Sequence, residues 1–302
     1  SNAKKFVELL NPTLAIFIKY EFWPNLLKEL KKKEIPTILV SGIFRENQIF
    51  FKYYGGFMRK SLKAFHHFFV QDDNSKQLLT TIHFENISVV GDTRFDRVSE
   101  ILEQDNSLDF IKEFKDNTYT VVAGSTWEED EALFVNYINH VASEEEKFII
   151  APHNIKQDSI IQLQKALHNK AVLFSEKSNK NLKEYQVFII DTIGVLTKIY
   201  SAADTAYVGG GLKTGLHNIL EPATFGVPIV IGNNYGKFKE AVDLVTLKGV
   251  VSIENQEEFT TILRSLKNDD LFRKSTGEIN KNYIQDNVGA TQSILKWMQQ
   301  KI

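Results

Sequence analysis

Three consecutive glycines, Gly209 to Gly211, begin the stretch of the chain that is richest in groups able to bind a ligand. Because glycine permits conformations and close approaches that other residues forbid, we expect a ligand or a neighbouring segment of the chain to pass there. His217, Asn218 and Glu221 follow in a predicted helix, where His217 and Glu221, four residues apart, share a face. A carboxylate can accept hydrogen bonds from two ribose hydroxyls, and an imidazole or amide can donate to a phosphate or sugar acid. The alternative is a flexible turn and a helix with a solvated glutamate.

A second candidate site follows a predicted strand, where Gly124, Ser125 and Thr126 lead into a helix. The start of a helix presents unpaired N–H groups and a positive partial charge, and both suit a phosphate. The Ser125 and Thr126 hydroxyls would add donors. The alternative needs no ligand, because Ser125 with Glu128 and Thr126 with Glu129 also fit two overlapping capping boxes.

Further polar or glycine-containing loops follow other predicted strands. Gly194 lies in one of them and could line a base or phosphate pocket, although an ordinary turn explains it equally well. His153 ends another strand, and a histidine there is more often structural than catalytic. Ligands of open α/β sheets bind at the carboxyl edge of the strands, so these loops are expected to converge on one site.

Glu21 is the candidate acid–base residue in the first third of the chain. Tyr20, Phe22 and Trp23 surround it in sequence, which predicts restricted water and a raised pKa. A surface carboxylate beside a hydrophobic staple is the alternative.

The elements that must position these residues alternate between strands and helices. Strands are indicated by short apolar runs at 14–18, 37–40, 67–70, 87–90, 119–123, 148–151, 171–174, 187–190, 205–208, 228–231 and 250–253. Helices are indicated at 23–33, 129–141, 155–167, 216–225 and 237–247. Strands without polar alternation are buried on both faces, and this predicts an α/β fold with parallel sheets.

Two domains are predicted, at residues 4–100 and 101–302, because the strand signal lapses between Asp92 and Asn117. The first holds only four predicted strands, so we expect an N-terminal domain that is truncated at its front.

Composition narrows the function classes. The chain has 302 residues, a net charge of -2 and no cysteine, which argues against general nucleic-acid binding, disulfides and thiolate catalysis. No Asp-x-Asp follows a strand, so no metal is predicted. No apolar run is long enough to cross a bilayer.

Several motifs together resemble, in order and spacing, those of bacterial transferases of 3-deoxy-D-manno-octulosonic acid (Kdo). The motifs are Tyr20–Asn25, Val90–Asp96, Ala123–Trp127, Asp191–Gly194, and Gly209–Leu212 through His217–Pro222. The resemblance covers nearly the whole chain, and the last motif is the most specific.

This resemblance implies a GT-B fold, with two Rossmann-like domains facing a cleft. It also implies an inverting glycosyltransferase that moves Kdo from CMP-Kdo to a lipid A precursor, lipid IVA, in lipopolysaccharide synthesis at the cytoplasmic face of the bacterial inner membrane. CMP-Kdo is the donor substrate, and no cofactor is expected. The implied site residues are Ser125 and Thr126 near phosphate, Gly194, Gly210 and Gly211 along the nucleotide, His217, Asn218 and Glu221 near phosphate and ribose, and Glu21 on the acceptor side.

Two departures from the family pattern affect these expectations. The usual arginine–histidine pair after Ala-Pro is replaced by His153-Asn154, so His153 or Lys156 is left to contact the phosphate. The family's membrane anchor and general base are not visible, so we expect both upstream of this chain and the chain itself to be inactive. The alternatives are another GT-B protein, such as a UDP-sugar transferase or epimerase, and a non-catalytic nucleotide-sugar-binding protein.

Overall fold

The computed structural model describes residues 2–168 and 170–301 and divides the chain into two compact units. The N-terminal unit comprises the residues up to Arg97 together with those from Asn287 onward, and the C-terminal unit is Val98–Asp286. Each unit contains a parallel sheet, which confirms the predicted α/β fold class.

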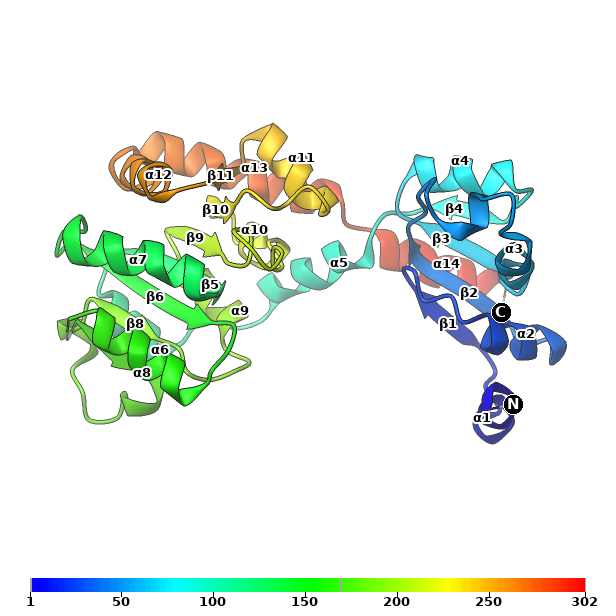
Figure 1. The fold of residues 1–302 in the computed structure, drawn as a ribbon, viewed down its shortest axis with the longest axis horizontal. Helices are drawn as coiled ribbons and strands as arrows, with labels where there is room; N and C mark the ends of the chain where they lie inside the picture. The colour runs from blue at the N-terminus through cyan, green and yellow to red at the C-terminus, as the bar shows by residue number, and fades with distance from the viewer. Residues whose placement is uncertain (1, 169, 302) are drawn as a thin grey trace. The chain divides into compact units, whose positions relative to one another are not determined.

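The N-terminal unit has a four-stranded sheet in the order β1-β2-β3-β4 (Figure 1). Its strands are β1 (Ala15–Ile18), β2 (Thr37–Gly42), β3 (His67–Val70) and β4 (Ile87–Val89). Its helices are α1 (Asn2–Leu10), α2 (Pro24–Lys32), α3 (Gly56–Leu62), α4 (Asp73–Thr81), α5 (Thr93–Ser99) and α14 (Ala290–Lys301). Buried side chains of α2, α3 and α4 pack against one face of this sheet.

The C-terminal unit has a seven-stranded sheet in the order β11-β10-β9-β5-β6-β8-β7, with every paired strand parallel. Its strands are β5 (Tyr119–Thr126), β6 (Glu146–Pro152), β7 (Ala171–Leu173), β8 (Val187–Ile189), β9 (Thr205–Val208), β10 (Ile229–Gly232) and β11 (Val250–Ile253). Its helices are α6 (Asp109–Lys115), α7 (Glu128–His140), α8 (Gln157–Ala166), α9 (Leu196–Ile199), α10 (Leu220–Thr224), α11 (Lys239–Leu247), α12 (Gln256–Asn268) and α13 (Asp270–Asp286).

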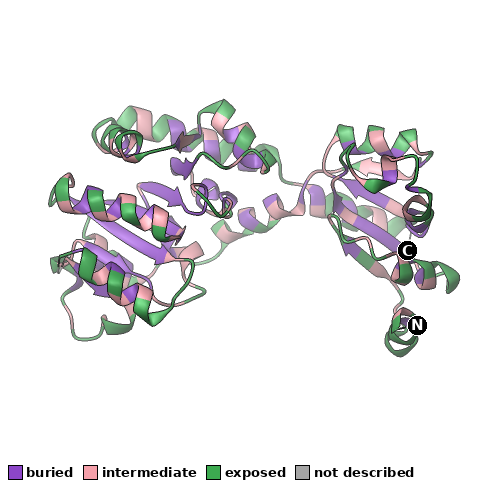
Figure 2. Ribbon diagram, in the orientation of Figure 1, coloured by how far each residue is buried: buried purple, intermediate pink, exposed green. Residues whose placement is uncertain are grey.

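The strands of this sheet are buried because helices cover them (Figure 2). Phe134 of α7, Leu163 of α8 and Phe259 of α12 belong to one core with apolar side chains from the strands. All four residues of β9 are buried, as expected for an apolar run without polar alternation. The sheet is therefore a rigid support for the loops at its edge.

The direction in which successive strands are added to the C-terminal sheet reverses at β5. From β5 the chain proceeds to β6 on one side, and β9 is paired with the other side of β5. Loops on either side of such a reversal leave the sheet in different directions, and the crevice between them is the usual binding site of an open α/β sheet. Ser125 lies near the end of β5, and the three glycines directly follow β9.

The predicted extent of the C-terminal domain, 101–302, is wrong at its end, because α14 belongs to the N-terminal unit. Ile294 and Trp297 of α14 pack with Ile38 and Phe69 on the other face of the four-stranded sheet. Asp96 also accepts hydrogen bonds from the backbone N–H groups of Gly289 and Thr291. Without α14 this face of the sheet would expose Phe69 and Ile38, which are fully buried.

No helix in residues 2–168 and 170–301 has the length and apolar character needed to cross a membrane.

Candidate functional site

The loops after β5, β9 and β10 pack backbone against backbone at the carboxyl edge of the C-terminal sheet. The N–H of Gly209 donates to the carbonyl of Gly124 at 2.9 Å, and a Cβ at position 209 would lie 2.3 Å from the carbonyl oxygen of Ser125. A Cβ at position 211 would lie 2.8 Å from the backbone nitrogen of Gly232. The sequence predicted that either a ligand or a neighbouring segment of the chain passes close to these glycines. The structure shows that neighbouring segments of the chain do so.

The structure changes the predicted roles of Ser125 and Thr126. Strand β5 continues through Thr126, and Ser125 has a positive φ of 54° at a register shift in the pairing with β6. Thr126 is buried, and its hydroxyl donates to Oε1 of Glu131 at 3.0 Å, so it has no second proton to offer a phosphate. The two capping boxes are wrong, because α7 begins only at Glu128.

Asp130 joins three parts of the site. Its Oδ2 accepts hydrogen bonds from the backbone N–H groups of Trp127 and Gly210, both at 2.9 Å. Its Oδ1 accepts the hydroxyl proton of Tyr207 at 2.6 Å. The carboxylate is buried, with 1% of the residue exposed. A charge this deeply buried is stable only when it is hydrogen-bonded, and these three donors fix the start of α7 against the glycine loop.

The first turn of α7 is strongly acidic, since Glu128, Glu129, Asp130 and Glu131 follow one another there. These carboxylates already satisfy the positive end of the helix dipole, so the start of α7 is a poorer phosphate site than the sequence suggested. Burial raises the pKa of Glu131 to about 7, with smaller contributions of the same sign from Asp130 and Glu128 and an opposing one from the Thr126 hydroxyl.

Trp127, His153 and His217 form a cluster of three rings, here called the ring cluster, contributed by the loops after β5, β6 and β9. The indole N–H of Trp127 donates to Nε2 of His217 at 3.0 Å, with the two ring planes 12° apart. His153 stacks on both, with its ring centroid 4.7 Å from that of Trp127 and 4.4 Å from that of His217. Three neighbouring loops are thus held together by their side chains.

The position of His217 corrects the predicted helix. Helix α10 begins at Leu220, so His217 precedes it and does not share a helical face with Glu221. Burial lowers the pKa of His217, His153 lowers it further, and Asp130 opposes both. The neutral ring is favoured, and because Nε2 accepts the indole proton, the ring proton resides on Nδ1.

Glu221 and Asn218 lie side by side after the glycine loop. Nδ2 of Asn218 donates to Oε1 of Glu221 at 3.0 Å, and the hydroxyl of Thr197 in α9 donates to Oε2 at 2.6 Å. Oδ1 of Asn218 accepts the N–H of Leu220, the first residue of α10. Glu221 therefore links the loop after β9 to the segment after β8, which the sequence did not predict.

Gly194 lies in this segment after β8, between the strand and α9. It is exposed and has a positive φ of 87°, and a Cβ at this position would meet no atom within 4 Å. Backbone geometry, rather than crowding by the protein, accounts for a glycine here. Its peptide groups are accessible, which is compatible with the predicted role along a nucleotide.

Glu21, in the N-terminal unit, does not have the environment predicted for it. Its carboxylate accepts the indole N–H of Trp23 at 2.8 Å, but Glu21 is exposed, and Tyr20 and Trp23 are 56% and 58% exposed. The three aromatic neighbours in sequence do not enclose it, so the expectation of restricted water is wrong.

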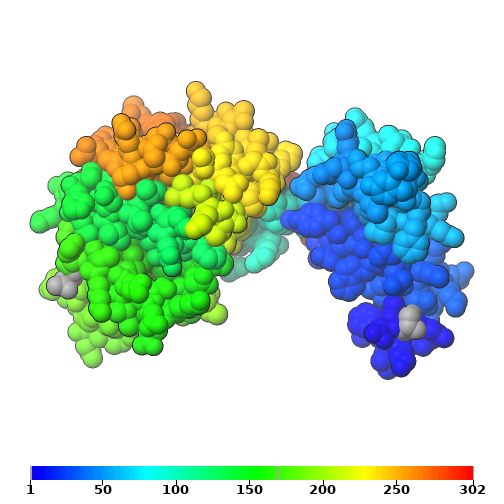
Figure 3. Space-filling view, in the orientation of Figure 1, coloured from blue at the N-terminus to red at the C-terminus, as the bar shows by residue number. Residues whose placement is uncertain are grey.

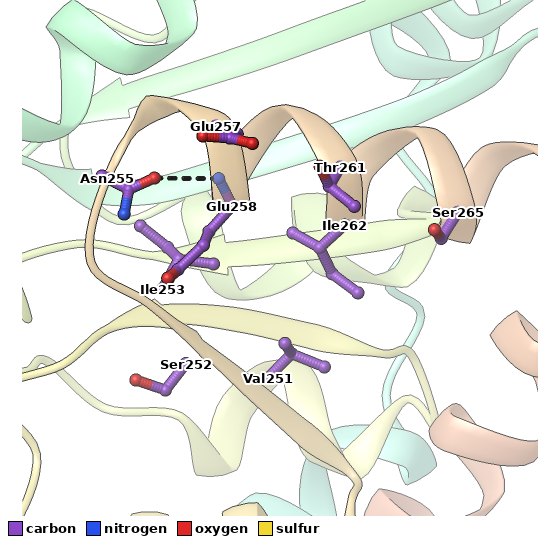
Figure 4. Close-up of a pocket in the computed structure, with 9 residues that line it drawn as sticks. All are labelled: Val251, Ser252, Ile253, Asn255, Glu257, Glu258, Thr261, Ile262 and Ser265. Carbon is purple, nitrogen blue, oxygen red and sulfur yellow. Dashed lines mark hydrogen bonds between the residues drawn. The ribbon is translucent and has the colours of Figure 1, made fainter.

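A separate groove of about 470 Å³ lies at the β11 edge of the C-terminal sheet (Figure 4). Ser252 and Ile253 of β11 line it together with α12, whose first turn is capped by a hydrogen bond from the N–H of Glu258 to Oδ1 of Asn255. None of the predicted site residues lines this groove.

Among residues 2–168 and 170–301, no group of three or more histidine, aspartate and glutamate side chains is arranged to hold a metal ion. The predicted absence of a metal remains a prediction.

Asp130, Trp127 and Thr197 are the residues that the sequence interpretation missed. Asp130 occupies the third position of a helix that follows a strand, a position where a carboxylate commonly caps, so this signal was present. Thr197 carried none, because its partner Glu221 is 24 residues away.

Known proteins resemble this chain over most of its length. Residues 1–97 match the family model of "3-Deoxy-D-manno-octulosonic-acid transferase (kdotransferase)". A Kdo transferase of Rickettsia typhi is 27% identical over 88% of this chain and 58% of its own length, and one of Haemophilus influenzae is 26% identical over 96% and 70%. The chain spans 47% to 58% of the length of three of the curated relatives it matches.

Solved structures resemble the fold. The C-terminal CMP-Kdo binding domain of WaaA from Acinetobacter baumannii is 22% identical, with a TM-score of 0.51 over 59% of this chain and 100% of that domain. UDP-GlcNAc 2-epimerase from Neisseria meningitidis is 13% identical, with a TM-score of 0.67 over 99% of this chain and 79% of the epimerase. The predicted resemblance to Kdo transferases and the predicted GT-B type of fold are both confirmed.

Proposed function

We propose that this chain, which resembles Kdo transferases over most of its length, carries the CMP-Kdo-binding part of an inverting Kdo transferase. The acceptor is a lipid A precursor, lipid IVA, and the reaction belongs to lipopolysaccharide synthesis at the cytoplasmic face of the inner membrane. The sequence similarity to named Kdo transferases supports this proposal.

The observation that carries the proposal is the convergence of polar groups at the edge of the C-terminal sheet. The ring cluster places His153 and His217 beside the glycine loop, and Asn218, which directly follows His217, is hydrogen-bonded to Glu221. A nucleoside monophosphate needs hydrogen-bond acceptors for its ribose and donors for its phosphate, and these residues are of both kinds.

We assign the ribose to Glu221 and the phosphate to the ring cluster. A ribose hydroxyl would replace the Thr197 hydroxyl or the Asn218 amide on the carboxylate of Glu221. The phosphate would accept from Nδ1 of His217 and from the exposed His153, which with Asn154 replaces the arginine–histidine pair of the family. This assignment moves the phosphate away from the acidic first turn of α7 and towards the imidazoles. Gly194, Gly210 and Gly211 remain assigned to contacts along the nucleotide. Ser125 is assigned to the edge of the nucleotide-binding site.

In the proposed reaction, a hydroxyl of the acceptor attacks the anomeric carbon of Kdo while a general base on the acceptor side takes its proton. The bond between that carbon and the phosphate oxygen breaks, and CMP leaves from the opposite face with inversion. Negative charge develops on the leaving phosphate, and fixed N–H donors stabilise it most effectively when they need not reorient. The stacking of His153 on Trp127 and His217 provides such fixed donors. Glu21 is assigned to acceptor binding in the N-terminal unit.

Titration calorimetry with CMP, UDP and GDP tests the donor assignment. CMP is expected to bind most tightly, and Glu221→Gln should weaken CMP about tenfold or more, because hydrogen bonds to a charged group contribute about 1.5–3 kcal/mol. Glu257→Gln, in the exposed first turn of α12, is the matched control and should leave the affinity unchanged. Tighter binding of UDP or GDP would favour another GT-B activity instead.

The transfer itself is tested by incubating the protein with CMP-Kdo and lipid IVA and detecting the product by mass spectrometry. NMR of the new glycosidic bond then reports the anomeric configuration, and retention would contradict an inverting reaction. Nucleotide binding without transfer by the full-length protein would favour a non-catalytic nucleotide-sugar-binding protein.

A further inference from the structure

Tyr200, which directly follows α9, has a hydroxyl group that forms no hydrogen bond within residues 2–168 and 170–301. Its ring is buried, with 2% of the residue exposed. By contrast, three other tyrosines of the C-terminal unit, Tyr119, Tyr137 and Tyr207, each form a hydrogen bond through their hydroxyl. Buried hydroxyls are nearly always hydrogen-bonded, so the exception at Tyr200 requires an explanation.

The hydroxyl of Tyr200 is not sealed inside the core. Within residues 2–168 and 170–301, the fully buried side-chain nitrogen and oxygen atoms without a hydrogen-bond partner are Oδ1 of Asn139 and Oδ1 of Asn280. Oη of Tyr200 also lacks a partner but does not belong to this buried class. The ring is therefore fixed by its burial, while the hydroxyl at its end is accessible to a ligand.

Glu221 lies close to this hydroxyl. The turn Tyr200–Ala202 packs beside α10, which carries Glu221. Thr197, three residues before Tyr200 and therefore on the same face of this helical segment, donates its hydroxyl to Oε2 of Glu221 at 2.6 Å. Burial raises the pKa of Tyr200, and the charge of Glu221 raises it further, so the phenol keeps its proton and is available as a donor.

The same hydroxyl lies against Gly124, near the end of β5. A Cβ at position 124 would overlap Oη of Tyr200, so glycine is required there to leave room for the phenol. The carbonyl of Gly124 accepts the N–H of Gly209, and the hydroxyl is thus located where the loops after β5 and β9 meet. In the space-filling view, yellow-green atoms from the chain after β9 adjoin green atoms on the surface of the C-terminal unit (Figure 3).

We propose that Tyr200 is a ribose-binding residue, whose hydroxyl donates a hydrogen bond to the same ribose hydroxyl that donates to Glu221. This inference rests on the assignment of the ribose to Glu221. A hydroxyl group donates one hydrogen bond and accepts others, so a ribose hydroxyl between these two residues would be satisfied in both roles. The missing partner of the phenol is then a group of the nucleotide.

This arrangement also decides which group leaves Glu221 when the ribose binds. The Thr197 hydroxyl, at 2.6 Å and partly buried, stays and holds the carboxylate in place. The amide of Asn218, at 3.0 Å and exposed, is displaced and is hydrated by water instead.

Tyr200→Phe tests the proposal, because it removes the hydroxyl and keeps the ring. Wild type and variant are titrated by calorimetry with whichever of CMP, UDP and GDP binds the wild type most tightly, and with the 2′-deoxy and 3′-deoxy forms of that nucleotide. The substitution should weaken binding of the ribonucleotide about two- to tenfold, the effect of one hydrogen bond between neutral groups. It should not weaken binding of the deoxy form that lacks the contacted hydroxyl.

Urea unfolding without nucleotide separates this role from a structural one. Because the phenol has no partner in the protein alone, the midpoint of unfolding of Tyr200→Phe should be unchanged or higher. Tyr137→Phe is the matched control, since its ring is also buried but its hydroxyl donates to Glu146 at the start of β6, the opposite edge of the sheet. This control should lower the midpoint and leave the nucleotide affinity unchanged.

Wild-type affinity in Tyr200→Phe would overturn the proposal. Equal weakening of the ribonucleotide and of both deoxy forms would also overturn it, because the hydroxyl would then contact another part of the nucleotide. A lower midpoint of unfolding together with weaker binding would assign Tyr200 a structural role instead. Tighter binding of UDP or GDP than of CMP would contradict the donor assignment alone, since all three nucleotides carry the same ribose. Absence of binding by all three would overturn both.

Discussion

Trp127 and His217, which are 90 residues apart in sequence, share one hydrogen bond from the indole N–H to Nε2 of the imidazole at 3.0 Å. The bond requires an unprotonated Nε2, because a doubly protonated ring has no acceptor to offer. The contact between the loops after β5 and β9 is therefore coupled to the protonation of His217.

Stability of the C-terminal unit should fall in acid because of His217. Its pKa is lower in the folded protein than the ordinary value of 6.5, so the unfolded state binds more protons as the pH falls through that value. The contribution of His217 to the free energy of unfolding should therefore decrease as the pH falls through 6.5 and below, and His217→Gln should remove that decrease.

Trp127 provides the measurement, as it is the only tryptophan between Val98 and Asp286. Urea unfolding followed by its fluorescence, in a background of Trp23→Phe and Trp297→Phe, reports on this unit. His67→Gln is the control, because burial also lowers the pKa of His67 but this residue lies in the other unit. If the free energy of unfolding of His217→Gln depended on pH as strongly as that of the wild type, this coupling would be contradicted.

Glu131 should make the free energy of unfolding depend on pH in the opposite direction. Its pKa is raised from 4.5 to about 7 by burial, so between these values the folded state holds more protons than the unfolded state. The contribution of Glu131 to stability should therefore fall as the pH rises through this window. Glu131→Gln should remove that fall and stabilise the unit at pH values above the window. Glu257→Gln, which changes an exposed carboxylate, should have no such effect on the same unfolding curves.

Asp130→Asn should destabilise the C-terminal unit by about 3 kcal/mol, because the amide cannot accept from all three buried donors that the carboxylate now serves. Tyr207→Phe removes only one of the three hydrogen bonds and should cost about 1 kcal/mol. Urea unfolding measures both. Equal effects of the two substitutions would mean that the Tyr207 hydroxyl alone accounts for the role of Asp130.

The strands were the part of the fold that sequence predicted best. Thr205–Val208 and His67–Val70 begin and end at the predicted residues, because uninterrupted apolar runs have few alternatives to a strand buried on both faces. The loop around His217 was wrongly predicted as helix. Its conformation is set by the hydrogen bond from Trp127 and by the crowding of Gly210 against Gly215, and neither is visible in a local pattern.

The assignment of α14 also depends on long-range contacts. Ile294 and Trp297 have the spacing of an amphipathic helix, but the spacing does not say which of the two sheets the helix covers. The site was predicted in outline because parallel strands bring their carboxyl ends to one edge. Asp130 and Thr197 act through partners that are distant in sequence, and for this reason their contacts required the structure.

Gly209→Ala should destabilise the C-terminal unit by about 3 kcal/mol, since the new methyl group would meet the carbonyl of Ser125 and the carboxylate of Asp130. Gly236→Ala is the matched control, because a Cβ there would meet nothing within 4 Å, and its effect should stay within about 0.5 kcal/mol. Thermal unfolding of both variants is the measurement. A tolerated alanine at 209 would imply that the loops after β5 and β9 separate readily.

Because α14 completes the N-terminal sheet, the C-terminal unit is inserted within the N-terminal one along the chain. Cleavage near Arg97 would not release an intact N-terminal unit, since the first fragment would lack α14, which would stay attached to the C-terminal unit. Excision of Val98–Asp286 as one piece, with Arg97 and Asn287 rejoined by a short linker, is therefore the division most compatible with independent folding of both parts.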